Sequence, residues 1–132
     1  EKPPRRTAPA REPVLFGEWL SPGVHVNLIG SNFLVKAEAD AEVFRDAVVT
    51  VDSKEQARLE AGDFVAAMEQ GLLRWSDVYE FSHVLTGRYP GRENADQRTI
   101  FKSLGLGIED IAVAVKVVEL AKAVGLGTEL SL

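Results

Sequence analysis

Three short runs of apolar, β-branched residues constrain the fold of this chain more than any other feature of its sequence. They lie at 24–29 (VHVNLI), 48–51 (VVTV) and 99–103 (TIFKS), with stretches of helical spacing between them. Runs of this length and composition are typical of strands that are covered on both faces. Because these strands alternate with helices, the sequence predicts an α/β fold built on a parallel sheet.

Capping signals predict helices between the strands. Asp40 is expected to cap a short helix that ends near 47. Ser53, followed by Gln56 three residues later, forms a capping box that starts a helix ending near 60. Both signals lie next to a predicted strand, which places each helix at one end of that strand.

Three further segments complete the expected order of elements. A helix is predicted over 64–70, where Gly71 follows, and another over 77–86, with Ser76 as its N-cap. Segment 13–20 (PVLFGEWL) is compatible with either a short helix or an extended connection before the turn that follows it.

The longest helical stretch covers 108–124 and is apolar around much of its circumference. Such a helix is expected to be buried against more than one neighbour. Few other elements remain in a chain of 132 residues to cover it. The sequence therefore predicts packing partners that lie outside this chain.

Composition argues against several classes of function. A net charge of -5 gives no electrostatic footprint for nucleic acid or for an anionic membrane. No apolar run approaches the roughly 20 residues that cross a bilayer, and no secretory signal precedes the first strand. The chain has no cysteine, and His25 and His83 have no third metal ligand near them in sequence, so no metal site is expected. These features fit a cytoplasmic protein.

A doubly wound parallel sheet binds dinucleotides at the carboxyl ends of its strands, usually beside a G-x-G-x-x-G turn. Segment 105–107 (GLG) is the nearest approach to that pattern, and it lacks the third glycine. We interpret these glycines as easing the turn from a strand into the last helix.

Several blocks of residues occur in an order that carries a specific resemblance. The longer blocks are 11–20 (REPVLFGEWL), 25–27 (HVN), 51–57 (VDSKEQA), 84–87 (VLTG) and 101–106 (FKSLGL). Shorter matches lie at 22–23, 62–63, 90–92, 109–110 and 125–128. In this order the blocks resemble the ornithine cyclodeaminase/mu-crystallin family from about residue 11 to the end of the chain.

The resemblance implies that the whole protein is a dimeric NAD(P)-dependent enzyme. In such an enzyme a substrate and dimerisation domain is followed by a Rossmann domain. It implies that 12–104 are the C-terminal half of a partial Rossmann-like, doubly wound NAD(P)-binding domain. The helix and tail at 105–132 would return toward the first domain, which lies outside this chain. Residues 1–11, rich in proline and basic residues, are predicted to be a disordered or non-native tail. Because the phosphate-binding turn is missing, this chain alone is not expected to bind the cofactor measurably or to be a complete catalyst.

Positions that line the cofactor in the family can be carried over residue by residue. They are Val26, Asn27, Leu28, Ile29, Lys36 and Ser103, with Leu104 beside the substrate. Simpler roles stay open for three of them. Asn27 is compatible with satisfying backbone groups at a strand end, Lys36 with a solvated side chain, and Ser103 with capping the last helix.

The most informative departure from the family lies at Asn32, where true cyclodeaminases have an aspartate that donates and accepts protons. An amide cannot exchange a proton near neutral pH, although it can still form hydrogen bonds. The substitution favours an imine or keto-acid reductase, or an amino-acid dehydrogenase, over a cyclodeaminase. An alternative is a non-catalytic, ligand-binding or dimer-associated remnant of the same fold. The sequence does not choose between NAD and NADP.

Overall fold

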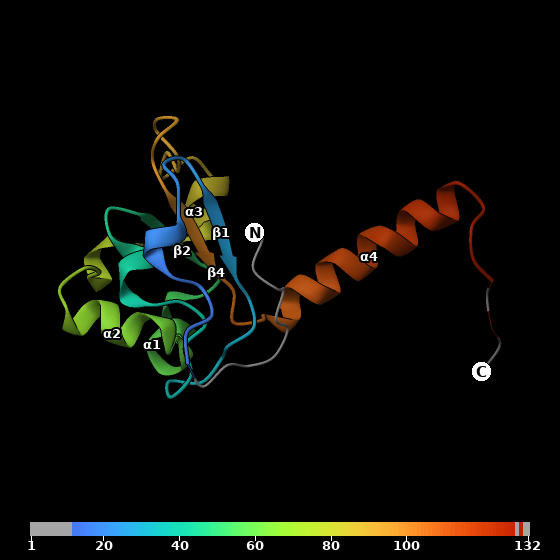
Figure 1. Cartoon of the computed structure of the whole chain (residues 1–132). Helices are drawn as coiled ribbons and strands as arrows, with labels where there is room; N and C mark the ends of the chain where they lie inside the picture. The colour runs from blue at the N-terminus through green and yellow to red at the C-terminus, as the bar shows by residue number, and fades with distance from the viewer. Residues whose placement is uncertain (1–11, 129, 131–132) are drawn as a thin grey trace.

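A computed structural model describes residues 12–128 and 130 of the chain. The described residues form one sheet of four parallel strands, in the order β1-β4-β2-β3 (Figure 1). The strands are β1 His25–Leu28, β2 Val48–Val51, β3 Val78–Glu80 and β4 Thr99–Lys102. The α/β class and the parallel sheet are confirmed. The predicted tail at 1–11 lies outside the described residues.

Short helices connect the strands, and one long helix follows the last strand. They are η1 Gly17–Trp19, η2 Ala41–Phe44, α1 Lys54–Glu60, α2 Asp63–Glu69, η3 Trp75–Asp77, α3 Phe81–Leu85 and α4 Gly107–Ala123. Segment 13–20 takes both of the forms left open for it. Leu15 pairs with Ala39 in an isolated parallel bridge, and η1 follows.

The predicted caps of η2 and α1 are confirmed. The Asp40 side chain accepts a hydrogen bond from the Val43 amide, and the Ser53 hydroxyl accepts one from the Gln56 amide at 3.2 Å. Each bond satisfies a backbone donor that the first turn of a helix leaves free. Helix α2 ends just before Gly71, as the sequence predicts, and Gly71 has the positive φ, 71°, that is typical after a helix.

One face of the sheet carries the main core. The central strand β2 is buried along its whole length, and Val49 and Val51 pack into a cluster with Ala57 of α1 and Phe64 of α2. The Phe44 ring meets the Phe64 ring edge to face, with centroids 5.4 Å apart. The helices η2, α1 and α2 therefore cover this face.

The opposite face of the sheet is less completely covered. Phe81 of α3 lies 5.2 Å from Phe101 of β4, measured between ring centroids, and the segment after α3 crosses the amino ends of the strands. Strand β1 alternates exposed and buried residues, with His25 and Asn27 exposed on this side. An exposed face on an edge strand is typical of a sheet that continues or is covered by further elements.

The prediction of a helix over 77–86 is wrong for the residues before 81. Residues 78–80 instead form β3, which pairs in parallel with 49–51 of β2. Val78 is 1% exposed in this position, so burial beside β2 decides the outcome over local helix propensity. Ser76 does not cap a helix, because its hydroxyl bonds the Asp77 carboxylate at 2.9 Å. Helix α3 is correspondingly short.

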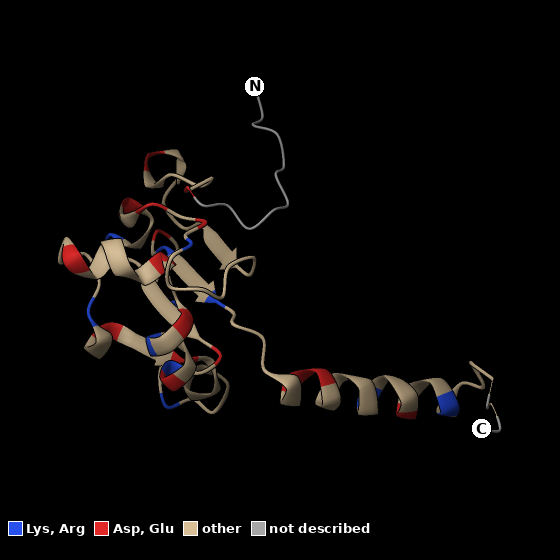
Figure 2. Cartoon of the chain, turned by 90° about the horizontal axis from the view of Figure 1, so that it is seen from below, with Lys and Arg blue, Asp and Glu red and all other residues tan. Residues whose placement is uncertain are grey.

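Helix α4 forms where it was predicted, and no described residue of this chain covers it, so its burial against partners outside the chain stays a prediction. None of its residues is buried, and it projects away from the sheet (Figure 1). Glu109 and Asp110 in its first turn and Lys122 in its last complement the helix dipole (Figure 2). No helix in the described part of the chain has the length and hydropathy to cross a membrane.

Candidate functional site

The carboxyl ends of the strands bring three loop starts together. Leu28 pairs with Lys102, and Lys102 pairs with Val51, so the residues that follow leave the sheet side by side. The Ser103 amide also bonds the Leu28 carbonyl at 3.0 Å. Open α/β sheets bind ligands at this edge. We refer to it below as the carboxyl edge.

A single carboxylate organises the loop after β4. Asp52 follows β2, and its Oδ2 accepts hydrogen bonds from the Ser103 hydroxyl at 3.1 Å, the Leu104 amide at 2.6 Å and the Gly105 amide at 3.0 Å. Bonds from amides and hydroxyls to an ionised carboxylate are stronger than those between neutral groups. Gly105, at φ 83°, supplies the turn that lets three donors reach one oxygen.

Ser103 therefore does not cap α4. The N-cap position of that helix is Leu106, which makes no side-chain bond to the helix. The capping alternative for Ser103 is wrong, because its hydroxyl hydrogen is directed to Asp52 instead. Its oxygen lone pairs remain able to accept a hydrogen bond from a ligand.

The loop at 30–39, between β1 and η2, is held at several points. The Gly30 amide donates to Glu38 Oε2 at 2.7 Å, and the Ser31 hydroxyl donates to the Lys36 carbonyl at 3.1 Å. Gly62 allows this loop to approach closely, since a Cβ there would lie 2.1 Å from the Lys36 carbonyl oxygen. These contacts fold the loop back on itself beside the carboxyl edge.

A buried ion pair lies beneath this loop, and sequence reasoning missed it. Lys102 is 0% exposed, and its Nζ lies 2.9 Å from Asp63 Oδ2 and 3.7 Å from Glu38 Oε2. It also donates a hydrogen bond to the Ser31 carbonyl. The signal was present: Lys102 follows buried Ile100 by two residues, which puts both on one face of a strand. A lysine on a core face requires a buried partner.

Four of the predicted site residues lie at or near the carboxyl edge with side chains that a ligand could reach. Asn32 and Ile29 are exposed, while Lys36 and Ser103 are half-buried. The Lys36 Nζ lies 4.9 Å from the centroid of the Phe33 ring. Their roles toward a cofactor stay predictions.

The other predicted residues present less to a ligand. Val26, Leu28 and Leu104 have side chains in the core, so only their backbone could meet a cofactor. Asn27 Oδ1 lies 3.2 Å from His25 Nε2 on the exposed face of β1. That contact gives Asn27 a local side-chain partner, which differs from the backbone role left open for it.

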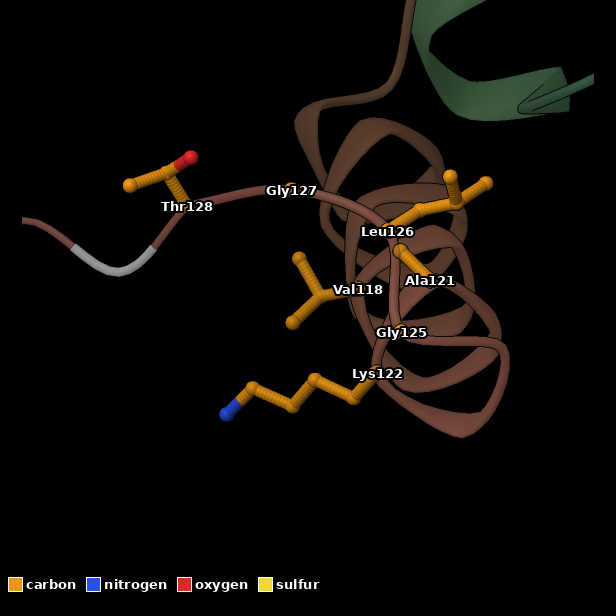
Figure 3. A pocket seen from close by; sticks show the side chains of 7 residues that line it. All are labelled: Val118, Ala121, Lys122, Gly125, Leu126, Gly127 and Thr128. Carbon is orange, nitrogen blue, oxygen red and sulfur yellow. The ribbon is translucent and has the colours of Figure 1, made fainter.

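A hollow lies far from this edge. It is formed by the last turns of α4 and by 125–128, and Lys122 is its one charged lining residue (Figure 3). Its other lining side chains, such as Val118 and Leu126, belong to the exposed helix and the segment after it. The hollow lacks convergent polar groups, which a cofactor site needs for orientation.

The family model for the ornithine cyclodeaminase/mu-crystallin family matches residues 6–125. The chain belongs to this family. Mouse ketimine reductase mu-crystallin, one relative, is 42% identical over 106 residues, which are 80% of this chain and 31% of the mouse protein. The resemblance predicted from the collinear sequence blocks is thus confirmed.

Two solved structures share the fold of this chain. Thermococcus litoralis delta(1)-pyrroline-2-carboxylate reductase, in complex with NADH and L-proline, gives a TM-score of 0.78 at 37% identity, over 92% of this chain and 38% of that one. An archaeal alanine dehydrogenase dimer with bound NAD gives a TM-score of 0.75 at 37% identity, over 96% of this chain and 39% of that one. The chain spans well under half the length of these family members.

Proposed function

We propose that the whole protein is an NAD(P)H-dependent reductase of an imino or keto acid, or an amino-acid dehydrogenase that catalyses the reverse oxidation. This chain would contribute the nicotinamide side of its crevice. The observation that carries the proposal is Asn32, an exposed amide beside the carboxyl edge at the family's proton-transfer position. An iminium already carries its proton, so its reduction requires chiefly a hydride, whereas cyclodeamination requires a protein group that exchanges protons.

The family members support the choice of reaction and cofactor. They include a ketimine reductase, a reductase in complex with NADH and L-proline, and an alanine dehydrogenase with bound NAD. All three names describe the interconversion of an amino acid with an imine or keto acid. When bound, the nicotinamide would supply the hydride.

The residues of this chain fit part of such a cofactor. Hydrogen-bonding groups of Asn32 and Ser103 follow adjacent strands at one edge, which suits the polar end of a nicotinamide. Lys36 adds a positive charge in the loop after β1, while the buried Leu104 can offer a ligand only its backbone. The described residues contain no glycine-rich phosphate-binding turn. In this proposal the phosphate side of the site would come from a glycine-rich turn that this chain does not contain.

We extend the proposal to partners and compartment. The substrate would be a small amino or imino acid, and the protein would act as a cytoplasmic homodimer. One family member of the same fold is a dimer, which supports the assembly. The absence of cysteine from this chain agrees with a reducing compartment.

Absorbance of NADH provides the test. The whole protein, as its gene encodes it, is mixed with NADH and delta(1)-pyrroline-2-carboxylate, and in a second reaction with L-ornithine and NAD. The proposal predicts NADH oxidation in the first reaction and no ammonia release in the second. Ammonia release from ornithine would refute the inference that Asn32 favours a reductase over a cyclodeaminase. NADH binding without turnover of cyclic imines or keto acids would favour the non-catalytic alternative.

The Asn32→Ala variant refines the test. Removing a donor that contacts the reacting groups commonly lowers kcat about tenfold or more. The matched control is Asn94→Ala, which alters an exposed loop asparagine at the other end of the strands. We expect the control to keep kcat within about twofold, because it removes only a local turn bond from the Asp96 amide, at the opposite end of the strands from the site.

A further inference from the structure

The ammonium group of Lys102 occupies an unusual place for a lysine. It is fully buried at the end of β4, between Asp63 at the start of α2 and the loop at 30–39. Taking an ammonium and a carboxylate out of water is costly, and a well-packed apolar pair of similar volume is often as stable or more so. Stability alone therefore gives a weak reason for this pair.

The geometry of the pair indicates what it does. Besides Asp63, the ammonium binds the carbonyl of Ser31, the residue immediately before Asn32. The Ser31–Asn32 peptide is trans, so its N–H and C=O point in opposite directions. Because the Ser31 carbonyl is directed inward to Lys102, the Asn32 amide is directed away from the core.

The Asn32 amide is consequently left available. Among residues 12–128 the Asn32 N–H donates to no backbone carbonyl, and Asn32 is exposed. Without the inward anchor, the peptide could rotate and carry both the backbone donor and the Asn32 side chain to another position. One peptide orientation thus decides what this residue presents at the carboxyl edge.

The carboxylate of the pair anchors the other end of the same loop. Asp63 Oδ1 accepts hydrogen bonds from the Glu38 amide at 2.6 Å and from the Ala39 amide at 3.1 Å. Lys102 and Asp63 therefore hold the loop near its start and at its end. Lys36 lies between these two anchors.

We propose that Lys102 is a positioning residue of the site: with Asp63 as its counter-ion, it fixes the loop at 30–39 and presents Asn32 to the substrate and nicotinamide. Its effect on catalysis rests on the reductase function proposed above, while its effect on the loop does not. Lys102 itself would touch neither the substrate nor the cofactor, since its side chain is buried.

The test removes the anchor without leaving a buried charge. In the double variant Lys102→Met/Asp63→Asn, the asparagine Oδ1 can still accept from Glu38 and Ala39, but the Ser31 carbonyl loses its partner. Asp63→Asn alone is not used as a control, because it would leave the buried ammonium without its closest counter-ion. Lys116→Met, at an exposed lysine of α4, controls for loss of a lysine as such.

The first measurement is amide hydrogen exchange in the 132-residue chain. We expect the Gly30 and Lys36 amides to exchange at least about tenfold faster in the double variant, while Val49 and Val51 of β2 change less than about twofold. A purely structural role would accelerate the loop and β2 together. That outcome, or an unchanged loop, would overturn the proposal.

The second measurement uses the whole protein with NADH and delta(1)-pyrroline-2-carboxylate. We expect kcat to fall at least about tenfold in the double variant, with the Kd for NADH within about threefold, because displaced groups weaken chemistry more than binding. The control Lys116→Met should keep kcat within about threefold. An unchanged kcat in the double variant would overturn the proposal. If the unmodified protein does not reduce imines, the proposed function fails, and the exchange result still decides whether Lys102 positions the loop.

Discussion

The body of the chain at 12–104 and helix α4 contain the same kinds of apolar residue, yet they bury them very differently. Ile100 of β4 is 1% exposed, whereas Ile111 of α4 is 66% exposed. In the body, strand pairing and helix packing surround each apolar side chain. Helix α4 is formed by local hydrogen bonds and favourable end charges, and no residue of the described body covers it. Local sequence therefore specifies the helix, while burial depends on neighbours.

The largest expected effect comes from removing the same side chain in both regions. Ile100→Ala should lower the free energy of unfolding by about 3 kcal/mol, since it removes buried methyl groups and leaves a cavity. Ile111→Ala should change it by less than about 0.5 kcal/mol in this chain. Urea denaturation followed by circular dichroism measures both. Equal losses in the two variants would mean that α4 packs against the body in solution.

A smaller difference in unfolding free energy is expected between variants of two aspartates, one in the body and one in α4. Asp52→Asn replaces an oxygen that accepts from Ser103, Leu104 and Gly105, and should cost about 1–3 kcal/mol of unfolding free energy. Asp110→Asn, at an exposed residue in the first turn of α4, should cost at most about 0.5 kcal/mol through the helix dipole. Nuclear magnetic resonance should also show faster exchange of the Leu104 and Gly105 amides in the first variant alone. A negligible change in these amides would contradict the role given to Asp52.

The smallest expected loss of stability comes from removing the cap of α1. Ser53→Ala removes the cap of α1 and should cost about 1 kcal/mol. Thr128→Ala, at an exposed residue beyond α4, serves as the control and should have no measurable effect. Thermal unfolding would resolve the two. A Ser53→Ala variant as stable as the control would show that tertiary packing, and not the cap, starts this helix.

Much of the fold could be predicted because its signals are local. Asp40 and Ser53 cap the helices that were expected, and the valine runs at 24–29 and 48–51 contain strands. Strand β3 escaped prediction because its three residues become a strand only by pairing with β2. Its local sequence continues smoothly into a helix, so nothing short-range separates the two.

The candidate site could be predicted only in part, for a similar reason. The resemblance to the family indicated Asn32 and Ser103, and the structure places both beside the carboxyl edge. It did not indicate Asp52, Asp63 or Lys102 as the groups that hold the loops. Each of these acts on residues far away in sequence, such as Asp52 on Leu104. Partners of that kind are visible only once the strands are paired.

A crystal structure of the whole protein with NADH would show whether the carboxyl edge forms the nicotinamide side of a reductase site. We predict that the nicotinamide ring lies at the ends of β1 and β4, within hydrogen-bonding or van der Waals contact of Asn32 and Ser103. A nicotinamide bound at the amino ends of the strands, or away from this sheet altogether, would rule out this placement of the site.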